Sequence, residues 1–175
     1  MSGVANRETV GVPTPLKHLL ASFDREHATT MRVLKALPKE KSELRPHPQC
    51  KTARELAWMF VLEQGAMEKG ITSGFDWSKP PAFPPPPEAY GEVLATFEKG
   101  HARIIELLRG LSEADLTRPV QFFTGPGKIA DIPMHDFLWL MLKDQVHHRG
   151  QFSIYLRMAD AKVPSIYGPT ADERW

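Results

Sequence analysis

The sequence predicts an all-α protein built as a four-helix bundle, and three observations carry that prediction. Four long segments repeat apolar residues at the spacing of an α-helix, about 100° per residue. A strand-like pattern is confined to one short stretch. The chain has 175 residues, enough for one domain with a sizeable core. We therefore expect a single domain over residues 1–175, with residues 1–13 as a flexible N-terminus, and periodicity alone leaves the helix topology open.

The first helix is expected over residues 14–37 and the second over residues 52–70. Pro38 ends the first, because proline cannot continue a helix. The second begins with TARE at 52–55, a capping box in which a hydroxyl and a carboxylate satisfy free backbone N–H groups. The apolar face of the first helix contains Leu16, Leu20, Phe23, His27, Met31 and Leu34, and that of the second contains Leu56, Met59, Leu62, Ala66 and Met67.

A proline-rich segment, KPPAFPPPPE at 79–88, separates the second helix from the third. It is short and lies between two helical patterns, so we interpret it as an ordered or semi-rigid connector. A partner-binding proline-rich segment is the alternative. The third helix is expected over residues 87–111.

Residues 117–131 are expected to be irregular or to form a short hairpin, because they combine the strand-like VQFF with the turn sequence TGPGK. Asp131 is expected to cap the fourth helix, with Pro133 in its first turn. That helix should continue to about Met158.

Charge and composition exclude several classes of function. There are 22 Lys and Arg against 21 Asp and Glu, scattered without a dense basic run, so no nucleic-acid-binding surface is expected. Cys50 is the single cysteine, which excludes an intrachain disulfide and fits a reducing compartment. The N-terminus lacks a secretory signal, and no apolar stretch is long enough to span a bilayer. We expect a cytoplasmic protein with no membrane partner.

Polar side chains lie on the apolar face of the fourth helix. Asp144 and His148 are i and i+4 neighbours there, and Gln151 and Tyr155 share the face, whereas Arg149 is predicted to point away. A carboxylate in an apolar environment is costly unless it is paired, protonated or bound to a metal. Asp144 and His148 are therefore candidate metal ligands, and a hydrogen bond between them is the alternative.

Two further titratable residues lie on core faces. Glu63 is on the second helix and His27 is on the first. Together with the fourth helix they predict a cluster near Met59, and carboxylates and imidazoles at helical spacing are how bundles build metal sites. The alternatives are an exposed position for Glu63 at the bundle end and an ordinary core position for His27.

The run HHRGQ at 147–151 resembles the signature of the DinB-like superfamily, whose last helix carries a His, three residues and then His-Arg-Gly-Gln. The segment TARELAWM at 52–59 is similar to the family segment that ends in a metal-binding His. The resemblance implies a four-helix bundle, often dimeric, in which three His hold a divalent ion. It also implies a metal-dependent hydrolase or a transferase that uses a small thiol.

The chain departs from the family pattern at two of the three ligand positions. Met59 replaces the first His and Asp144 replaces the second, so only His148 matches. With two protein ligands, the sequence predicts that a divalent ion such as Zn or Ni binds weakly or not at all. Two functions stay open: an enzyme with an altered metal site and an unassigned small-molecule substrate, and a non-catalytic small-molecule-binding or interaction domain that has lost the metal. The family also implies a homodimer.

Overall fold

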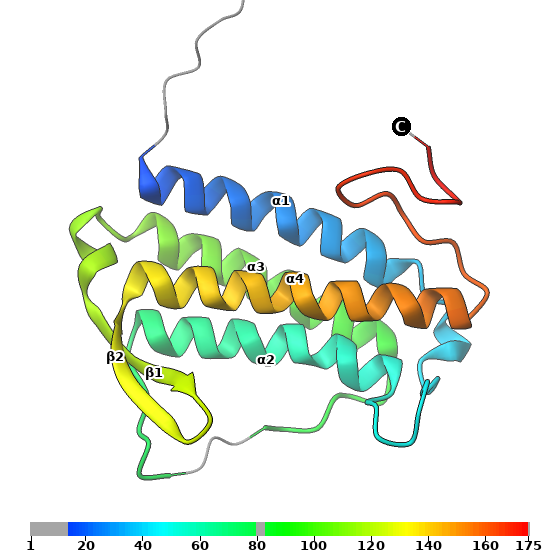
Figure 1. Ribbon diagram of the computed structural model, residues 1–175, viewed down its shortest axis with the longest axis horizontal. Helices are drawn as coiled ribbons and strands as arrows, with labels where there is room; N and C mark the ends of the chain where they lie inside the picture. Colours follow the sequence, from blue (N-terminus) through cyan, green and yellow to red (C-terminus); the bar gives the residue numbers. More distant parts are fainter. Residues whose placement is uncertain (1–13, 80–82, 175) are drawn as a thin grey trace, which may run out of the picture.

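A computed structural model describes residues 14–79 and 83–174 of the chain. The helices α1 (Pro15–Lys35), α2 (Ala53–Ile71), α3 (Tyr90–Arg109) and α4 (Met134–Met158) form a bundle (Figure 1). The predicted four-helix bundle is thus confirmed, and the helix bounds differ from the predicted ones by a few residues at most. The predicted flexible segment 1–13 lies outside the described residues.

The helices are not arranged around the bundle in chain order. α1 packs against α3 and α4, and α2 packs against the same two helices, so α1 and α2 lie diagonally opposite each other. Figure 1 shows that α1 and α4 run in one direction and that α2 and α3 run in the other. Because α2 and α3 are parallel neighbours, the chain between them returns along the length of the bundle.

The predicted capping box opens α2. The Thr52 hydroxyl accepts a hydrogen bond from the backbone N–H of Glu55 at 3.1 Å, and the Glu55 carboxylate accepts one from the N–H of Thr52 at 2.7 Å. Two N–H groups that a helix start leaves without partners are thereby satisfied. The first turn of α2 is fixed in this way, which sets which residues of α2 face α4.

The segment before α4 is a hairpin of two antiparallel strands, β1 (Pro119–Gly125) and β2 (Lys128–Pro133). Its turn places Gly127 at φ +67°, a left-handed conformation that favours glycine. The predicted capping role of Asp131 is wrong. Asp131 pairs with Gln121 inside the ladder, and Pro133 is the N-cap of α4 rather than part of its first turn. Because the strand pairing continues as far as Pro133, Asp131 is held in the β-ladder and does not cap the helix.

Aromatic rings close the end of the bundle where the hairpin lies. The Phe122 ring contacts the rings of Phe75 and Phe137 at centroid distances of 5.2 and 5.0 Å. Trp77 stacks on Phe75 and donates from Nε1 to the carbonyl of Gln121 at 3.2 Å. These contacts hold the hairpin against the first turns of α4.

The described part of the proline-rich connector is attached to α2. Trp58 Nε1 donates to the carbonyl of Pro84 at 2.7 Å, and Arg54 Nη1 donates to that of Pro87 at 2.9 Å. Residues 80–82 lie outside the described residues, so the stiffness of the whole connector stays a prediction. Phe83 is 68% exposed. The homodimer, for which this connector could supply apolar contacts, also stays a prediction.

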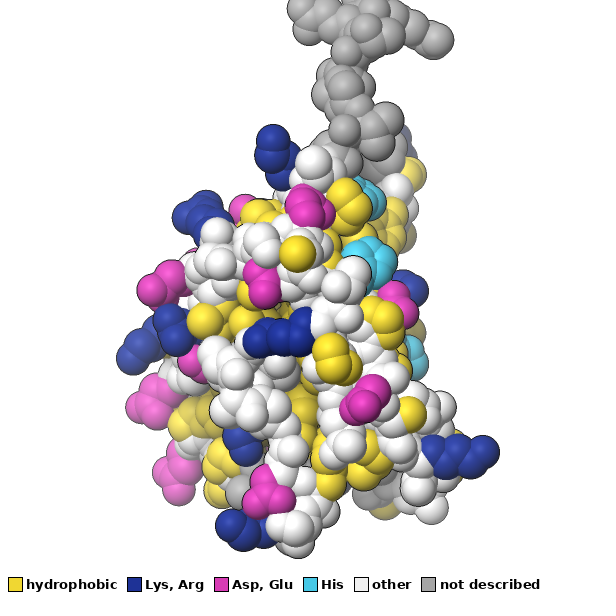
Figure 2. Space-filling view, turned by 90° about the vertical axis from the view of Figure 1, so that its left-hand side faces the viewer, with side chains coloured by type: hydrophobic (Ala, Val, Ile, Leu, Met, Phe, Trp, Pro, Cys, Tyr) yellow, Lys and Arg dark blue, Asp and Glu magenta, His cyan; other side chains and the backbone are white. Residues whose placement is uncertain are grey.

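The surface carries charges of both signs. In Figure 2, which looks onto the end of the bundle with the hairpin, basic and acidic side chains are interspersed among apolar ones. Within the described ranges, no helix combines the length and the apolar character that a membrane crossing requires.

Candidate metal centre

The buried face of α4 is rotated from the predicted one. Gln145, Arg149 and Phe152 are buried, whereas Asp144 and His148 are only partly buried. The centre of the face therefore lies roughly a quarter of a turn away from Asp144. Asp144 and His148 occupy the edge of this face, next to α2.

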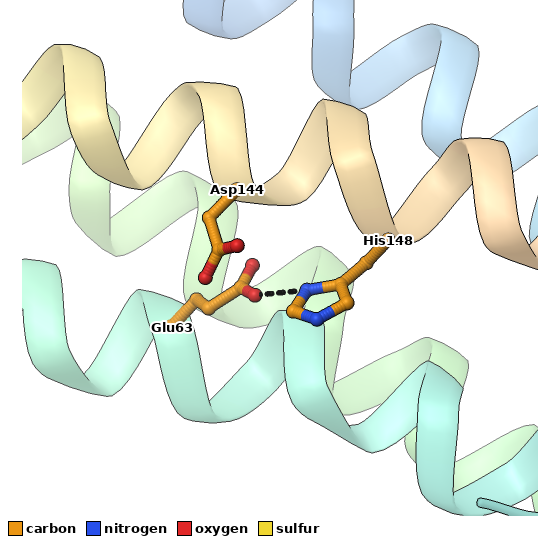
Figure 3. A group of neighbouring side chains, drawn as sticks. All are labelled: Glu63, Asp144 and His148. Carbon is orange, nitrogen blue, oxygen red and sulfur yellow. Dashed lines mark hydrogen bonds and ion pairs between the residues drawn. The ribbon is translucent and has the colours of Figure 1, made fainter. Parts of the chain in front are cut away.

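Three predicted residues come together at that edge (Figure 3). Glu63 of α2 and Asp144 and His148 of α4 each offer a ligand atom, and these atoms all lie within 4.8 Å of one another. Nδ1 of His148 and Oε1 of Glu63 form a short hydrogen bond of 2.5 Å. The ring of Phe60 meets the His148 ring edge-on at a centroid distance of 6.2 Å. The i, i+4 spacing on α4 and the burial of Glu63 on α2 thus produce the predicted convergence.

The group contains two carboxylates but only one imidazole, so its negative charge is not fully neutralised. Glu63 is 6% exposed, and its Oε2 atom has no hydrogen-bond partner among the described residues. Burial, followed by the proximity of Asp144, raises the pKa of Glu63 to about 7, against the opposing effect of His148. The hydrogen bond to Glu63 raises the pKa of His148. Two neighbouring carboxylates with one imidazole therefore retain a proton near neutral pH, or require a cation.

The donor set fits a divalent ion. Two carboxylates and one imidazole give three protein ligands, the number usual for a catalytic metal, and carboxylate oxygens suit harder ions than three imidazoles do. The partnerless Oε2 of Glu63 is a buried acceptor that an ion would satisfy. Glu63 thus adds a third candidate donor to the two that the sequence analysis counted, because the sequence left its position open.

Two other predicted residues do not join this group. Met59 precedes Glu63 by one helical turn, and it lines a neighbouring pocket with Trp58 and Leu62. His27 lies between α1 and α3, where its ring stacks on that of His101. α1 lies diagonally across from α2, which explains why His27 does not reach Glu63.

A pocket of about 490 Å³ opens beside His148. Its lining includes the predicted residues Gln151 and Tyr155, together with Cys50 and Lys51 from the loop before α2. The Tyr155 hydroxyl donates to the carbonyl of Lys51 at 2.8 Å, which holds this loop against α4. Gln151 is exposed, and its amide is 2.9 Å from Nε2 of His147. The sequence did not point to Lys51, which carries no pattern of its own.

Arg149 contradicts the prediction that it points away from the core. It is 1% exposed, and its guanidinium lies 2.8 Å from the carboxylate of Glu26 on α1. It also donates to the hydroxyl of Tyr167 at 2.6 Å, and that hydroxyl donates to Glu26 at 2.6 Å. A buried guanidinium is tolerated when it is paired in this way. These contacts fix the C-terminal segment against α1 and α4.

Carboxylates and imidazoles that project from facing helices into a bundle are the groups from which helical bundles build metal sites. The chain belongs to the DinB family, whose family model matches residues 11–174. It is similar to the uncharacterized protein YrdA of Bacillus subtilis (strain 168), with 29% identity over 163 residues, 91% of this chain and 92% of YrdA.

Solved structures with a similar fold include the following two. A DinB-like protein from Bacillus cereus ATCC 10987 has a TM-score of 0.74 at 25% identity, covering 86% of this chain and 97% of that one. YfiT from Bacillus subtilis is described as a probable metal-dependent hydrolase with an unusual four-helix bundle topology. It has a TM-score of 0.65 at 15% identity, covering 93% of this chain and 97% of YfiT.

Proposed function

We propose that Glu63, Asp144 and His148 hold a divalent metal ion and that the protein is a metal-dependent enzyme, a hydrolase or a small-thiol transferase. The observation that carries this proposal is the convergence of three donors within 4.8 Å of one another, together with a buried Glu63 oxygen that has no hydrogen-bond partner in the described part of the chain. A bound divalent ion lowers the pKa of a coordinated water or thiol and so supplies a nucleophile near neutral pH.

The donor on α2 is displaced by one turn from the family position. Met59 stands where the family pattern has a His, and Glu63 lies four residues later on the same side of the helix. The Glu63 side chain is long enough to reach the neighbouring helix, where its Oε1 lies 2.5 Å from Nδ1 of His148. We infer that Glu63 takes over the role of the missing imidazole and changes the preference from Zn or Ni toward Mn or Fe.

The residues of the pocket would position the substrate. His148 contributes both to the group of three donors and to the lining of the pocket, so it links the ion to the space beside it. Lys51 offers a cation and Gln151 an amide at the same pocket, groups that bind polar or anionic parts of a small molecule. The pocket volume suits a small-molecule ligand.

Metal analysis of the untagged protein tests the proposal. We expect about one equivalent of a divalent transition metal at this centre, and Glu63→Gln should weaken its binding at least tenfold, because it removes a charged donor. Glu55→Gln is the matched control, since Glu55 is on the same helix, outside the group of three donors, and serves the cap and an ion pair with Arg45. If Glu63→Gln and Glu55→Gln bind the same metal with equal affinity at this centre, Glu63 is not a ligand.

The alternative is a non-catalytic binding domain, and Met59 is the observation that favours it. A family metal ligand is absent there, and the remaining group could hold a shared proton instead of an ion. Under this alternative the purified protein contains no metal at this centre. Its stability should then be unchanged by a chelator and by added Mn, Fe, Zn or Ni.

A further inference from the structure

A second cavity, of about 500 Å³, lies between α1 and α4. The two helices pack against each other and run in the same direction (Figure 1). The lining residues come from 18–26 of α1 and from 139–147 of α4, about two helical turns each, so the cavity is a groove roughly 12 Å long. The Glu63 centre lies toward α2 instead, and this cavity, the α1–α4 groove, is therefore a separate feature.

The buried part of the groove is apolar except for one hydroxyl. Leu142 is buried and Val146 is partly buried, and both line the groove from α4. Ser22 of α1 is 2% exposed, and its hydroxyl has no hydrogen-bond partner among the described residues. Buried polar groups normally have a partner. A ligand oxygen that enters the groove would accept a hydrogen bond from this hydroxyl.

An aromatic ring stands at each end of the groove. The partly buried Trp139 donates from Nε1 to Nε2 of His135 at 3.1 Å, which fixes the orientation of its indole. The Tyr167 hydroxyl, at the other end, is held by Arg149 and Glu26, each at 2.6 Å. The two rings are thus positioned before any ligand arrives, and flat apolar molecules pack well against such rings.

The exposed edge of the groove carries positive charge that is not compensated. Lys143 has no ion-pair partner in the described part of the chain, and Arg25 meets only Glu26, at 3.7 Å. Glu26 is the one carboxylate among the described lining residues, and it is already paired with Arg149 at 2.8 Å. A negatively charged group would therefore complete the electrostatics of the groove.

We propose that the α1–α4 groove is a second small-molecule site, which binds an amphipathic anion, namely an aromatic carboxylate. Its flat apolar body would lie against Leu142, Val146 and Trp139, and its carboxylate would lie between Arg25 and Lys143. The fork of an Arg side chain matches the geometry of a carboxylate, and the volume of the groove suits a molecule of this size. The site does not depend on a metal at the Glu63 centre.

Titration with 2-naphthoate tests the site, and its uncharged analogue 2-naphthamide is the control ligand. The full-length protein is first freed of metal, so that the carboxylate cannot bind through an ion. Binding is followed by nuclear magnetic resonance at the indole N–H signals of Trp139 and Trp58, which are assigned with Trp→Phe variants. Trp58 lines the pocket near Met59 and so reports on binding elsewhere. We expect 2-naphthoate at millimolar concentration to saturate a shift of the Trp139 signal, and 2-naphthamide to bind about tenfold more weakly or less.

Three variants locate the anion. Arg25→Gln and Lys143→Gln should each weaken 2-naphthoate binding by about fivefold or more, because each removes a charged donor. Lys17→Gln is the matched control, since Lys17 is an exposed cation on α1 that does not line the groove, and it should change the affinity less than about twofold. Trp139 and Lys143 also line a hollow beside the hairpin, whereas Arg25 does not, so Arg25→Gln is the deciding variant.

Three results would overturn the proposal. The first is a Trp139 signal that 2-naphthoate does not move at millimolar concentration. The second is equal affinity for 2-naphthoate and 2-naphthamide, which would make the groove an apolar surface without selectivity for anions. The third is an equal effect of Arg25→Gln and Lys17→Gln, which would place the carboxylate outside the α1–α4 groove.

Discussion

α4 has a buried polar cluster on each side, and the two clusters differ in whether their hydrogen bonds are complete. Toward α1, Arg149 is paired with the carboxylate of Glu26, with Tyr167 bridging the two. Toward α2, Glu63 is hydrogen-bonded to His148 and lies beside the Asp144 carboxylate, and one Glu63 oxygen has no hydrogen-bond partner among the residues described. A completed network stabilises the fold by itself, whereas an incomplete one indicates a proton or an ion that belongs there.

The largest effect should come from breaking the completed cluster. Arg149→Met removes the buried cation that lies 2.8 Å from Glu26 and leaves only the more distant, exposed Arg25 at 3.7 Å, so we expect a loss of about 3–5 kcal/mol in the free energy of unfolding. Arg157→Ala is the control on the same helix, because its pair with Asp172 is exposed and should contribute at most about 1 kcal/mol. Urea denaturation measures both. Equal losses for the two variants would show that the Arg149 cluster is not a structural support.

The incomplete cluster should respond to pH in metal-free protein. The pKa of Glu63 is raised from 4.5 to about 7, so between these values the folded chain holds a proton that the unfolded chain has released. The contribution of Glu63 to stability is therefore greatest below about pH 4.5 and is lost as the pH rises to about 7, by on the order of 3 kcal/mol. Glu63→Gln should remove this contribution. The measurement is the difference in unfolding free energy between wild type and variant, in chelator, at about pH 5 and pH 8.

Bound metal should offset that loss of stability at and above about pH 7, because a cation replaces the proton that Glu63 has released. A difference between wild type and Glu63→Gln that does not change with pH in chelator would mean that Glu63 is ionised throughout. The contrast between the two sides of α4 would then be lost.

A smaller effect is expected for the bridging hydroxyl. Tyr167→Phe removes the group that accepts from Arg149 and donates to Glu26, but it leaves the direct ion pair intact. We expect a loss of about 1 kcal/mol. Thermal or urea unfolding of the variant checks this value, and a loss as large as that for Arg149→Met would assign the main contribution to the C-terminal segment instead of the ion pair.

The smallest effect concerns Met59. Its side chain is partly buried, lines a neighbouring pocket and stands outside the group of three donors, so Met59→Leu should change metal affinity less than about twofold and cost less than about 1 kcal/mol. Calorimetric titration with the same ion checks the first expectation. A loss of binding would make the thioether a ligand and would revise the donor set.

Helical periodicity predicted the four helices, and the i, i+4 spacing of Asp144 and His148 predicted that their side chains lie close together. Local chemistry was also informative, because the capping box and the Pro-Gly turn depend on neighbours in the chain. Arg149 was misplaced because the predicted buried face was centred on Asp144, roughly a quarter of a turn from its observed centre. Its partners Glu26 and Tyr167 are 123 and 18 residues away, and their proximity follows from the tertiary fold alone.

The same reasoning explains the outcome for the predicted cluster. Glu63 joined it because α2 packs against α4, and His27 did not because α1 meets α2 only across the diagonal. Periodicity identifies which face of a helix is buried but not which helix covers it. For that reason the sequence could not predict that, between α1 and α3, His27 lies near Glu98 and His101 lies near Asp24.

The diagonal placement of α1 and α2 also bears on the order in which the protein can assemble during synthesis. A nascent chain that has reached Ile71 contains two of the four helices, yet each of them buries its apolar face mainly against α3 and α4, which the ribosome has not yet made. The first half of the chain therefore emerges with apolar faces that lack their main partners, and these faces stay open to chaperones until α3 and then α4 follow.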